Sequence, residues 1–464
     1  MRIAIIAEVY LPKIDGVVIR TLNLIRQLQA QGDDVLVFCP QVEGERNSPV
    51  PVVEFPGFAF PMYPEYQVGR PDQRLIDELQ KFEPDVVHFI NPFAFGFQCY
   101  DLLATAGLPL PTLFSFHTYY AEFVKRYGVL RPLSGLLWWL TKRYHNRANM
   151  NLTVSDITRI DLSERGFDRV RLWQPAVDST LFHPDQTCAD MRSRLRGEHE
   201  RKHLLLTVSR LAPEKNVEFL RDVLQRVPDA QLAVVGDGPH RASLEKYFKD
   251  LPVTFVGYLK GQQLAQAYAS ADAFVYASET ETMGNVILEA MACGLPIVAP
   301  RAGGIPSLVE QDESALLFTP GDADAAASDT QRVLTDEGLR RKLTQNARVW
   351  AEEHGWSQAA ARVRRDYADA STLWSTGADG VPAEAALQST GLWAKLVTTG
   401  LTSIFRLVST FTTKPVTPEP AAVPSAATAV EKTEHAAQDA TADASHQGVD
   451  PPEQSENQKL ATTS

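Results

Sequence analysis

Residues 271–300 of the chain read ADAFVYASETETMGNVILEAMACGLPIVAP. The apolar run at 273–276 and the later run LPIVAP predict buried strands, and we expect a helix to begin between them near Met283 or Gly284. Strands that are apolar on both faces and joined by a helix are typical of a parallel sheet covered by helices. The stretch therefore predicts an α/β fold.

The same alternation of strand and helix occurs twice along the chain. The first half contains the runs RIAIIAEVY, DVLVFCP, PDVVHFI, PTLFSFH and NMNLTVS, with a helix expected over 21–31. After the proline-rich and charged residues 173–202, the runs HLLLTVSRL, AQLAVVGDG and VTFVGYL start the pattern again, with helices expected over 217–226 and 240–248. We predict two doubly wound, Rossmann-like domains, 1–185 and 186–350, that face each other across a cleft where the ligand binds.

The C-terminal part of the chain has a different composition. Residues 412–464 are rich in Ala, Pro, Thr, Ser and Glu and have few large apolar residues, which predicts a disordered tail. Residues 391–411 place Trp393, Val397, Leu401 and Ile404 at helical spacing beside the cations Lys395 and Arg406. This pattern suits an amphipathic helix that lies on an anionic membrane, although an ordinary helix docked on the globular part has the same pattern.

Charge and cysteine content exclude several classes of function. The 464 residues carry 45 Lys and Arg against 57 Asp and Glu, a net charge of −12, which argues against a nucleic-acid partner. Four cysteines stand far apart without C-x-x-C spacing, so neither a zinc site nor a disulfide framework is expected. The first residues read as a buried strand rather than a signal peptide, and we expect a cytoplasmic protein.

Two cations follow the strand predicted in VSRLAPEKN. Arg210 and Lys215 stand five positions apart in a loop, where together they could neutralise a diphosphate. Gly16, in the turn after the first predicted strand, would allow the backbone to approach a phosphate closely. The simpler interpretations are two solvated surface charges and an ordinary turn glycine.

Two carboxylates, Glu281 and Glu289, stand eight positions apart around Gly284. The free N–H groups of a helix N-terminus attract phosphate, whereas carboxylates repel phosphate and accept hydrogen bonds from hydroxyls. We therefore expect an elongated ligand with a sugar at Glu281, a ribose at Glu289 and a diphosphate in its middle, that is, a nucleotide-diphosphate sugar. The simpler interpretation of Glu281 alone is a favourable charge near a helix N-terminus.

A histidine at the end of a predicted strand is the remaining candidate for the reacting region. His117, in SFHTYYAEF, is followed by polar residues and would point its imidazole toward the ligand, but His88 in DVVHFINP fits the same description. The glycine-rich VVGDGPH fails as a dinucleotide motif, because Arg241 stands where the pattern requires glycine. The chain also lacks a P-loop sequence.

Several of these motifs, in this order, resemble one known family. The Gly16 loop, His117, VSRLAPEKN, VVGDGPH, the Glu281–Glu289 stretch and the closing HGWS region, over roughly residues 1–370, are similar to GT-B glycosyltransferases of the GT4 family. The segments RIAIIAEVYLPKIDGVV, SFHTYYAEFVKRYG and RVRLWQPAVDSTLFHP are most similar to sulfoquinovosyldiacylglycerol synthases and related glycolipid α-mannosyltransferases. Where such relatives usually read Arg-Gly-Val-Asp, this chain has Pro-Ala-Val-Asp at 175–178. The resemblance therefore does not extend to the interdomain hinge.

The resemblance implies a retaining glycosyltransferase that needs no metal and takes a UDP- or GDP-sugar. It assigns Arg210 and Lys215 to the diphosphate, Glu281 to the donor sugar, Glu289 to ribose and His117 to the reacting sugar, with Gly16, Gly284 and Asn285 completing the donor site. It also implies a helix over 351–372 that returns toward the N-terminal domain, which would hold the acceptor.

The acceptor expected from the resemblance is a lipid, which would associate the protein peripherally with an anionic membrane. The expected transfer is from UDP-sulfoquinovose to diacylglycerol; transfer from GDP-mannose or to another acceptor, a same-fold epimerase, and a non-catalytic nucleotide-sugar or membrane-binding protein are the alternatives. The segment LLWWLTKRYHNR could contact the lipid, but core packing of Trp138 and Trp139 is the simpler account.

Overall fold

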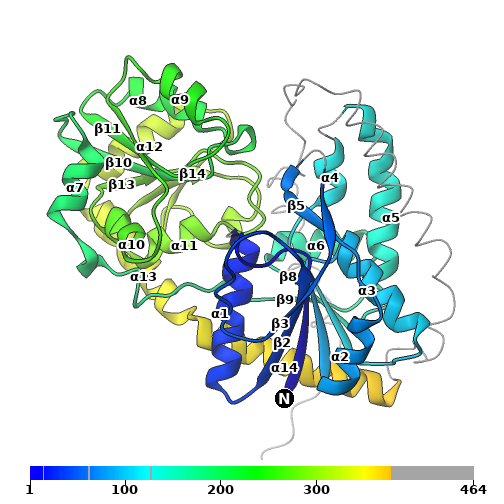
Figure 1. Ribbon diagram of the computed structural model, residues 1–464. Helices are drawn as coiled ribbons and strands as arrows, with labels where there is room; N and C mark the ends of the chain where they lie inside the picture. The colour runs from blue at the N-terminus through cyan, green and yellow to red at the C-terminus, as the bar shows by residue number, and fades with distance from the viewer. Residues whose placement is uncertain (14, 61–62, 126–127, 378–464) are drawn as a thin grey trace, which may run out of the picture. The chain divides into compact units, whose positions relative to one another are not determined.

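The computed structural model describes residues 1–13, 15–60, 63–125 and 128–377. The helix predicted over 391–411 and the tail predicted over 412–464 lie outside the described residues. Within the described residues, two separate parallel sheets carry the fold, and each is covered by helices on both faces (Figure 1). The predicted α/β class with two Rossmann-like units is confirmed.

The first sheet has seven parallel strands in the order β3-β2-β1-β6-β7-β8-β9. These strands are β1 (Arg2–Ala7), β2 (Asp34–Pro40), β3 (Val52–Phe55), β6 (Val86–Ile90), β7 (Thr112–Phe116), β8 (Met150–Thr153) and β9 (Val170–Leu172). A separate antiparallel hairpin joins β4 (Gly57–Phe60) to β5 (Tyr63–Gly69). The strand order reverses between β1 and β6, which is where ligands bind in doubly wound sheets.

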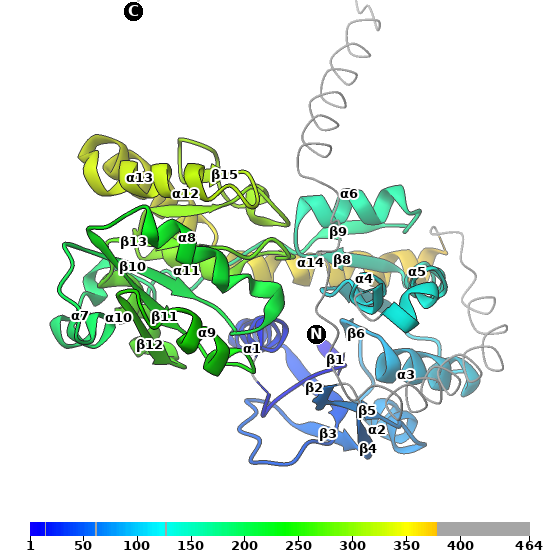
Figure 2. The same ribbon diagram turned by 90° about the horizontal axis from the view of Figure 1, so that it is seen from above.

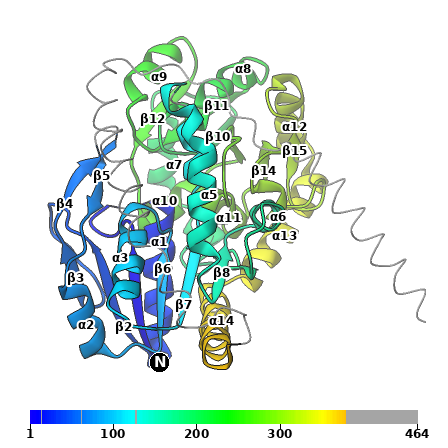
Figure 3. The same ribbon diagram turned by 90° about the vertical axis from the view of Figure 1, so that its right-hand side faces the viewer.

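Alternate residues of β1 point to opposite faces of this sheet and enter two different cores. Ala4 and Ile6 pack with the helices α2, α3 and α5, whereas Ile3 and Ile5 pack with α1 and the C-terminal helix α14. Figure 3 shows α5 as the long helix in the foreground. The helices of this part of the chain are α1 (Gly16–Ala30), α2 (Arg74–Phe82), α3 (Ala94–Thr105), α4 (Tyr120–Lys125), η1 (Gly128–Leu133), α5 (Ser134–His145) and α6 (Asp156–Glu164).

The second sheet has six parallel strands in the order β12-β11-β10-β13-β14-β15 (Figure 2). They are β10 (His203–Val208), β11 (Ala230–Val235), β12 (Val253–Gly257), β13 (Ala273–Val275), β14 (Ile297–Pro300) and β15 (Leu316–Phe318). The order reverses between β10 and β13. Those two strands are followed directly by the VSRLAPEKN and ETETMGN loops, so the fold brings both predicted motifs to one switch point.

Two cores again lie on the two faces of this sheet. Leu204 and Leu206 of β10 pack with α7, α10, α11 and α13, whereas Leu205 packs with α8, α9 and α12. The helices are η2 (Pro184–Gln186), α7 (Ala189–Arg196), η3 (Pro213–Lys215), η4 (Val217–Phe219), α8 (Leu220–Gln225), α9 (Arg241–Tyr247), α10 (Gly261–Ala269), α11 (Asn285–Ala292), η5 (Ile305–Ser307), α12 (Ala323–Thr335) and α13 (Glu337–Glu353).

The last described helix, α14 (Trp356–Thr376), packs on the first sheet although it follows the second in sequence. Tyr367 is fully buried, and its hydroxyl lies 2.8 Å from Nδ1 of His88 in β6. Arg364 forms an ion pair with the buried Asp33. Burial lowers the pKa of His88 to about 3, so this histidine is neutral and pairs with Tyr367 inside the core.

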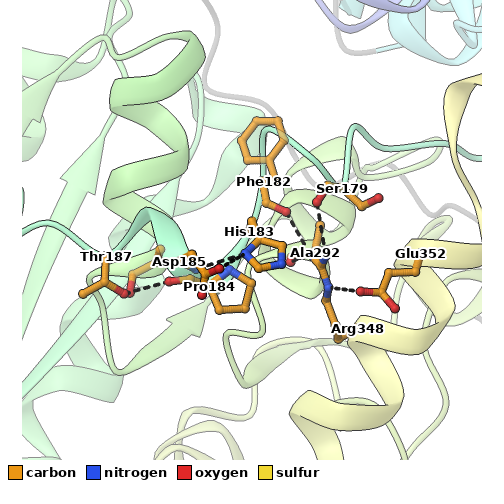
Figure 4. A network of polar contacts seen from close by, with 10 residues as sticks. Ser179, Phe182, His183, Pro184, Asp185, Thr187, Ala292, Arg348 and Glu352 are labelled. Atoms are coloured by element: carbon orange, nitrogen blue, oxygen red, sulfur yellow. Dashed lines mark hydrogen bonds and ion pairs between the residues drawn. The ribbon is translucent and has the colours of Figure 1, made fainter.

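The segment that joins the two sheets is held by backbone contacts at several points. Figure 4 shows Arg348 of α13 reaching the carbonyl oxygens of Ser179, Phe182 and Ala292, while its Nε donates to Glu352 at 2.7 Å. Nearby, the N–H of Val177 donates to the carbonyl of His354 at 3.0 Å. The Pro-Ala-Val-Asp sequence is therefore paired with the chain that precedes α14.

Candidate active site

The carboxyl ends of β10 and β13 carry most of the residues predicted from the sequence. Nζ of Lys215, at the end of η3, lies 2.6 Å from Oε1 of Glu281, and the hydroxyl of Tyr276 donates to the same oxygen at 2.7 Å. Both side chains of the ion pair are largely buried, at 22% and 14% exposure. Lys215 was expected at the diphosphate and Glu281 at the sugar, whereas in the structure the two side chains form an ion pair with each other.

The ion pair determines the charge of Glu281. Burial would raise the pKa of this carboxyl, but the nearby Lys215 ammonium and the hydrogen bond from Tyr276 outweigh burial and hold the pKa below its usual value. Glu281 is thus ionised at neutral pH and remains a strong acceptor for hydroxyl groups. Tyr276 and Lys215 both hydrogen-bond to Oε1, and neither of them hydrogen-bonds to Oε2.

Glu289 lies on α11 in a different environment. The hydroxyl of Tyr268, on α10, donates to its Oε2 at 2.8 Å, and no cation pairs with it among the described residues. Its side chain keeps some accessible surface although protein atoms surround it. Burial raises the pKa of Glu289 to about 7, against the smaller opposing effect of Tyr268. The two carboxylates of the motif therefore differ in charge behaviour near neutral pH.

Gly284 forms the N-terminal boundary of α11. Its φ of 97° lies in the left-handed region, which a residue with a side chain rarely adopts. No side chain caps the helix, so the first N–H groups of α11 lack a side-chain partner. A Cβ on Gly16, the first residue of α1, would lie 3.0 Å from Nδ2 of Asn285. The helix N-termini that carry Gly16 and Asn285 are therefore adjacent. That of α11 is open to an anion, whereas the Asp15 carboxylate already caps that of α1.

Arg210 lies directly after β10, and its side chain is exposed. The loop that carries it packs against the glycines of VVGDGPH: a Cβ on Gly236 would lie 1.8 Å from the carbonyl oxygen of Ser209, and one on Gly238 would lie 2.3 Å from that of Leu211. The N–H of Leu211 donates to the carbonyl of Asp237 at 3.0 Å. These glycines therefore support the Arg210 loop.

The loop that carries Glu281 has an equivalent support that the sequence did not indicate. A Cβ on Gly303 would lie 2.4 Å from the carbonyl oxygen of Glu281, and one on Gly304 would lie 2.3 Å from that of Thr282. The N–H of Gly304 donates to the carbonyl of Glu281 at 2.7 Å. The stretch RAGGIPSLV contains these glycines, but their role is visible only once β14 lies beside β13.

His117 follows β7 in the first sheet and is buried, with 6% exposure. Its Nε2 lies 2.9 Å from Oγ of Ser115, and its backbone N–H donates to Oδ1 of Asn91. Burial, with the nearby Arg20 adding to its effect, holds the pKa of His117 well below its usual value. The imidazole is therefore neutral, and it can act as a hydrogen-bond partner but not as a cation.

Asn91, which the sequence analysis did not single out, organises the end of β6. It has a φ of 50°, uncommon for a residue with a side chain, and its Nδ2 donates to the hydroxyls of Thr118 and Tyr120 at 3.1 and 2.8 Å. Such conformations persist where several contacts hold them, and they concentrate at functional sites. The side chain of Asn91 therefore holds Thr118 and Tyr120 through its N–H groups and the backbone of His117 through its oxygen.

The described part of the chain contains neither a cluster of metal ligands nor a helix that could span a membrane. No three His, Cys, Asp or Glu side chains there come together as a metal site. None of the helices described is both long enough and apolar enough to cross a bilayer. The expectation that catalysis needs no metal stays a prediction.

Two doubly wound parallel sheets, the second with Arg210, Lys215, Glu281 and Glu289 at or near its switch point, are the architecture of the GT-B fold. Residues 14–181 match the family described as Glycosyltransferase Family 4, and residues 192–350 match Glycosyl transferases group 1. The chain belongs to this family of glycosyltransferases.

Individual relatives agree with this assignment. The chain is 34% identical to the Sulfoquinovosyl transferase SQD2 of Arabidopsis thaliana, over 76% of this chain and 71% of the relative. It is 36% identical to a GDP-mannose-dependent alpha-mannosyltransferase of Mycolicibacterium smegmatis, over 75% of this chain and 94% of the relative. The solved structure of HepE from Anabaena superposes with a TM-score of 0.63 at 19% identity, covering 79% of this chain and 99% of that chain, which supports the fold alone.

Proposed function

We propose that this enzyme transfers a sugar, with retention of configuration, from a nucleotide-diphosphate sugar to a lipid. The first candidate is transfer of sulfoquinovose from its UDP donor to diacylglycerol. Similarity to SQD2 over three quarters of the chain is the observation that carries this candidate. The second candidate is transfer of mannose from GDP-mannose, since the mannosyltransferase relative has comparable identity.

In this proposal the switch point of the second sheet binds the donor. Arg210 and Lys215 neutralise the diphosphate, whose charge grows as the bond to the anomeric carbon breaks, so their contribution is greatest in the transition state. The N-terminus of α11, at Gly284 and Asn285, adds backbone N–H groups and a favourable dipole, and Gly16 lets the backbone approach the diphosphate closely. Glu281 accepts hydrogen bonds from hydroxyls of the transferred sugar, and Glu289 accepts them from ribose.

The first sheet supplies His117 and the acceptor side. Because His117 is neutral, we assign it a hydrogen bond to the reacting sugar rather than a charge. The departing diphosphate takes the proton of the acceptor hydroxyl as the new glycosidic bond forms. This route needs no carboxylate nucleophile and no metal.

Helix α5 supports a lipid acceptor. Trp138 packs between Phe116 and the guanidinium of Arg165, as the core interpretation expected, but Trp139 is 51% exposed and Leu136 is 40% exposed. The core interpretation is thus wrong for Trp139. The exposed cation Arg143 lies 5.6 Å from its ring centre. Apolar side chains beside cations suit the headgroup region of an anionic membrane, where we propose that the enzyme associates peripherally.

A vesicle experiment tests this membrane surface. Trp139→Ala should lower the partition coefficient onto phosphatidylglycerol vesicles by about tenfold, because an exposed indole loses its burial in the interface. Tyr258→Ala, which removes a side chain that is 58% exposed beyond β12, is the control and should leave partition unchanged. Equal partition of both variants would count against α5 as the membrane surface.

A donor panel tests the transfer itself. We expect the purified enzyme to release nucleotide from UDP-sulfoquinovose when diacylglycerol vesicles are present and not when they are omitted, with or without EDTA. Faster release from GDP-mannose would favour the second candidate. Release that needs no acceptor would point to an epimerase or hydrolase, and binding without release would support a non-catalytic protein.

A further inference from the structure

Arg20 of α1 is a buried cation with unusual partners. Its side chain is 1% exposed, and its Nη2 donates to the backbone carbonyls of Trp173 and Gln174, both at 2.6 Å. Nη1 donates to the sulfur of Met283 at 2.9 Å, a weak acceptor, and the buried Nε has no hydrogen-bond partner. The guanidinium also lies 4.5 Å from the ring centre of Trp173.

No acidic side chain among the described residues pairs with Arg20. Burial alone lowers its pKa, to about 9, and no nearby anion opposes the effect. The guanidinium is nevertheless charged at neutral pH. A buried charge without a counter-ion is costly, so its retention calls for a reason beyond local packing.

Arg348 offers a comparison, because it also binds the connecting segment, residues 173–202, which joins the two sheets. Like Arg20, it donates to backbone carbonyls of that segment, those of Ser179 and Phe182. Arg348 is partly exposed and pairs with Glu352 at 2.7 Å. An arginine can therefore bind the backbone of this segment and still have an acidic partner. The lack of an acidic partner at Arg20 is a separate feature.

The surroundings of Arg20 lie at the proposed sugar position. Trp173 contacts the Arg20 guanidinium and, on its edge, the ring of His117 at 5.4 Å between centres. Met283, the sulfur acceptor, is two residues beyond Glu281 and directly precedes Gly284. His117 and Glu281 are the residues assigned to the transferred sugar, whereas the diphosphate is assigned to Arg210 and Lys215.

We propose that Arg20 receives an oxyanion substituent of the transferred sugar, such as a sulfonate or a carboxylate, and so makes the enzyme select charged over neutral sugars. The oxyanion replaces the Met283 sulfur at Nη1, a change that the flexible thioether side chain allows. The inference rests on the proposed function, since it identifies the class of donor that the same site takes. Binding of the anion supplies the counter-charge that the ligand-free site lacks.

The test compares donors that share one nucleotide. For wild type and Arg20→Gln, kcat/KM would be measured with UDP-sulfoquinovose and UDP-glucose, and dissociation constants for UDP, UDP-sulfoquinovose and UDP-glucose by calorimetry. The preference of wild type for the sulfonated donor should fall roughly 10- to 100-fold in Arg20→Gln, in binding as well as in turnover. Arg20→Lys should retain part of this preference, because it keeps the charge.

Three further variants or controls separate this role from packing. Arg26→Gln changes an exposed arginine of the same helix and should leave the preference unchanged. Met283→Leu removes the sulfur but not the cation, and should keep or increase the preference. Circular dichroism and thermal melting identify variants that do not fold, in which case the Arg20→Lys and Met283→Leu results decide.

Two outcomes would overturn the proposal. An equal loss of UDP binding and of both donors in folded Arg20→Gln would mean that Arg20 serves the diphosphate or the connecting segment. Wild-type turnover of UDP-glucose with no preference for the sulfonated donor would leave glycosyl transfer standing and reject the role of Arg20. Absence of turnover with every donor would instead count against the proposed function, and the calorimetric preference would still decide the role of Arg20.

Discussion

At the scale of single residues, the Lys215–Glu281 ion pair is the feature on which the proposed catalysis depends most directly. Lys215 has three N–H donors, so it can hold Glu281 and a phosphate oxygen together. Lys215→Ala should lower kcat by about 10²-fold or more, as loss of a group that stabilises developing charge usually does. It should also leave Glu281 without its cation and raise the pKa of that carboxyl.

Single-turnover release of nucleotide would measure the effect on chemistry, separate from product release. Lys342→Ala is the matched control, because Lys342 pairs with Glu313 on the surface. Unchanged turnover in Lys215→Ala, with the protein folded, would reject the proposed role of this lysine.

Glu289 gives a prediction about pH. Its pKa of about 7 means that the carboxyl is protonated at pH 6 and ionised at pH 8. An ionised carboxylate is the stronger acceptor for ribose hydroxyls, so the KM for the donor should fall as pH rises through about 7. The diphosphate of the donor is ionised throughout this range and does not contribute.

Glu289→Gln provides the comparison for this profile. The amide does not titrate, so the KM of the variant should stay constant between pH 6 and 8. A wild-type KM that does not change with pH, or a variant that keeps the transition, would show that another group titrates.

At the scale of elements, two loops are shaped by glycines that follow neighbouring strands. Gly303 has a φ of 56°, and a Cβ there would lie 2.4 Å from the carbonyl oxygen of Glu281. Gly303→Ala must therefore displace the loop that carries Glu281, and we expect it to lower the free energy of unfolding by about 2 kcal/mol more than a control. It should also reduce kcat/KM.

Gly321→Ala is the appropriate control. Gly321 has a φ of 80° but no atoms within 4 Å of its Cβ position, so alanine there adds backbone strain without a close contact. Urea denaturation would give both free energies. Equal losses in the two variants would mean that the contact with Glu281 is relieved without cost.

At the same scale, apolar runs in the sequence account for most strands but not for all of them. The apolar runs predicted β1, β2, β6, β7, β8, β10, β11, β12, β13 and β14, because buried strands of a parallel sheet need continuous apolar sequence. The strands β9 and β15, of three residues each, were not predicted from such runs. The helix expected over 21–31 begins at Gly16, because Asp15 caps it with bonds to the N–H groups of Val17 and Val18.

At the scale of the whole molecule, the candidate site was predictable where it consists of local motifs and not where it depends on distant segments. Lys215 and Glu281 follow β10 and β13, which are neighbours in the doubly wound strand order that the fold class implies. Arg20 meets Trp173 and Met283, which are more than 150 and 260 positions away. No periodicity or spacing in α1 distinguishes it from a surface arginine.

The return of α14 to the first sheet gives the last prediction. Tyr367→Phe removes the hydroxyl that pairs with Nδ1 of His88. The buried imidazole of His88 then has no hydrogen-bond partner, because its Nε2 already lacks one. The unpaired nitrogen should lower the free energy of unfolding by about 1–3 kcal/mol. Tyr247→Phe, at a side chain that is 45% exposed, should change it by less than about 0.5 kcal/mol. Equal urea midpoints for both variants would mean that the apolar face of α14, with Val363 and Ala370 in the core, suffices to hold it against β6 and β7.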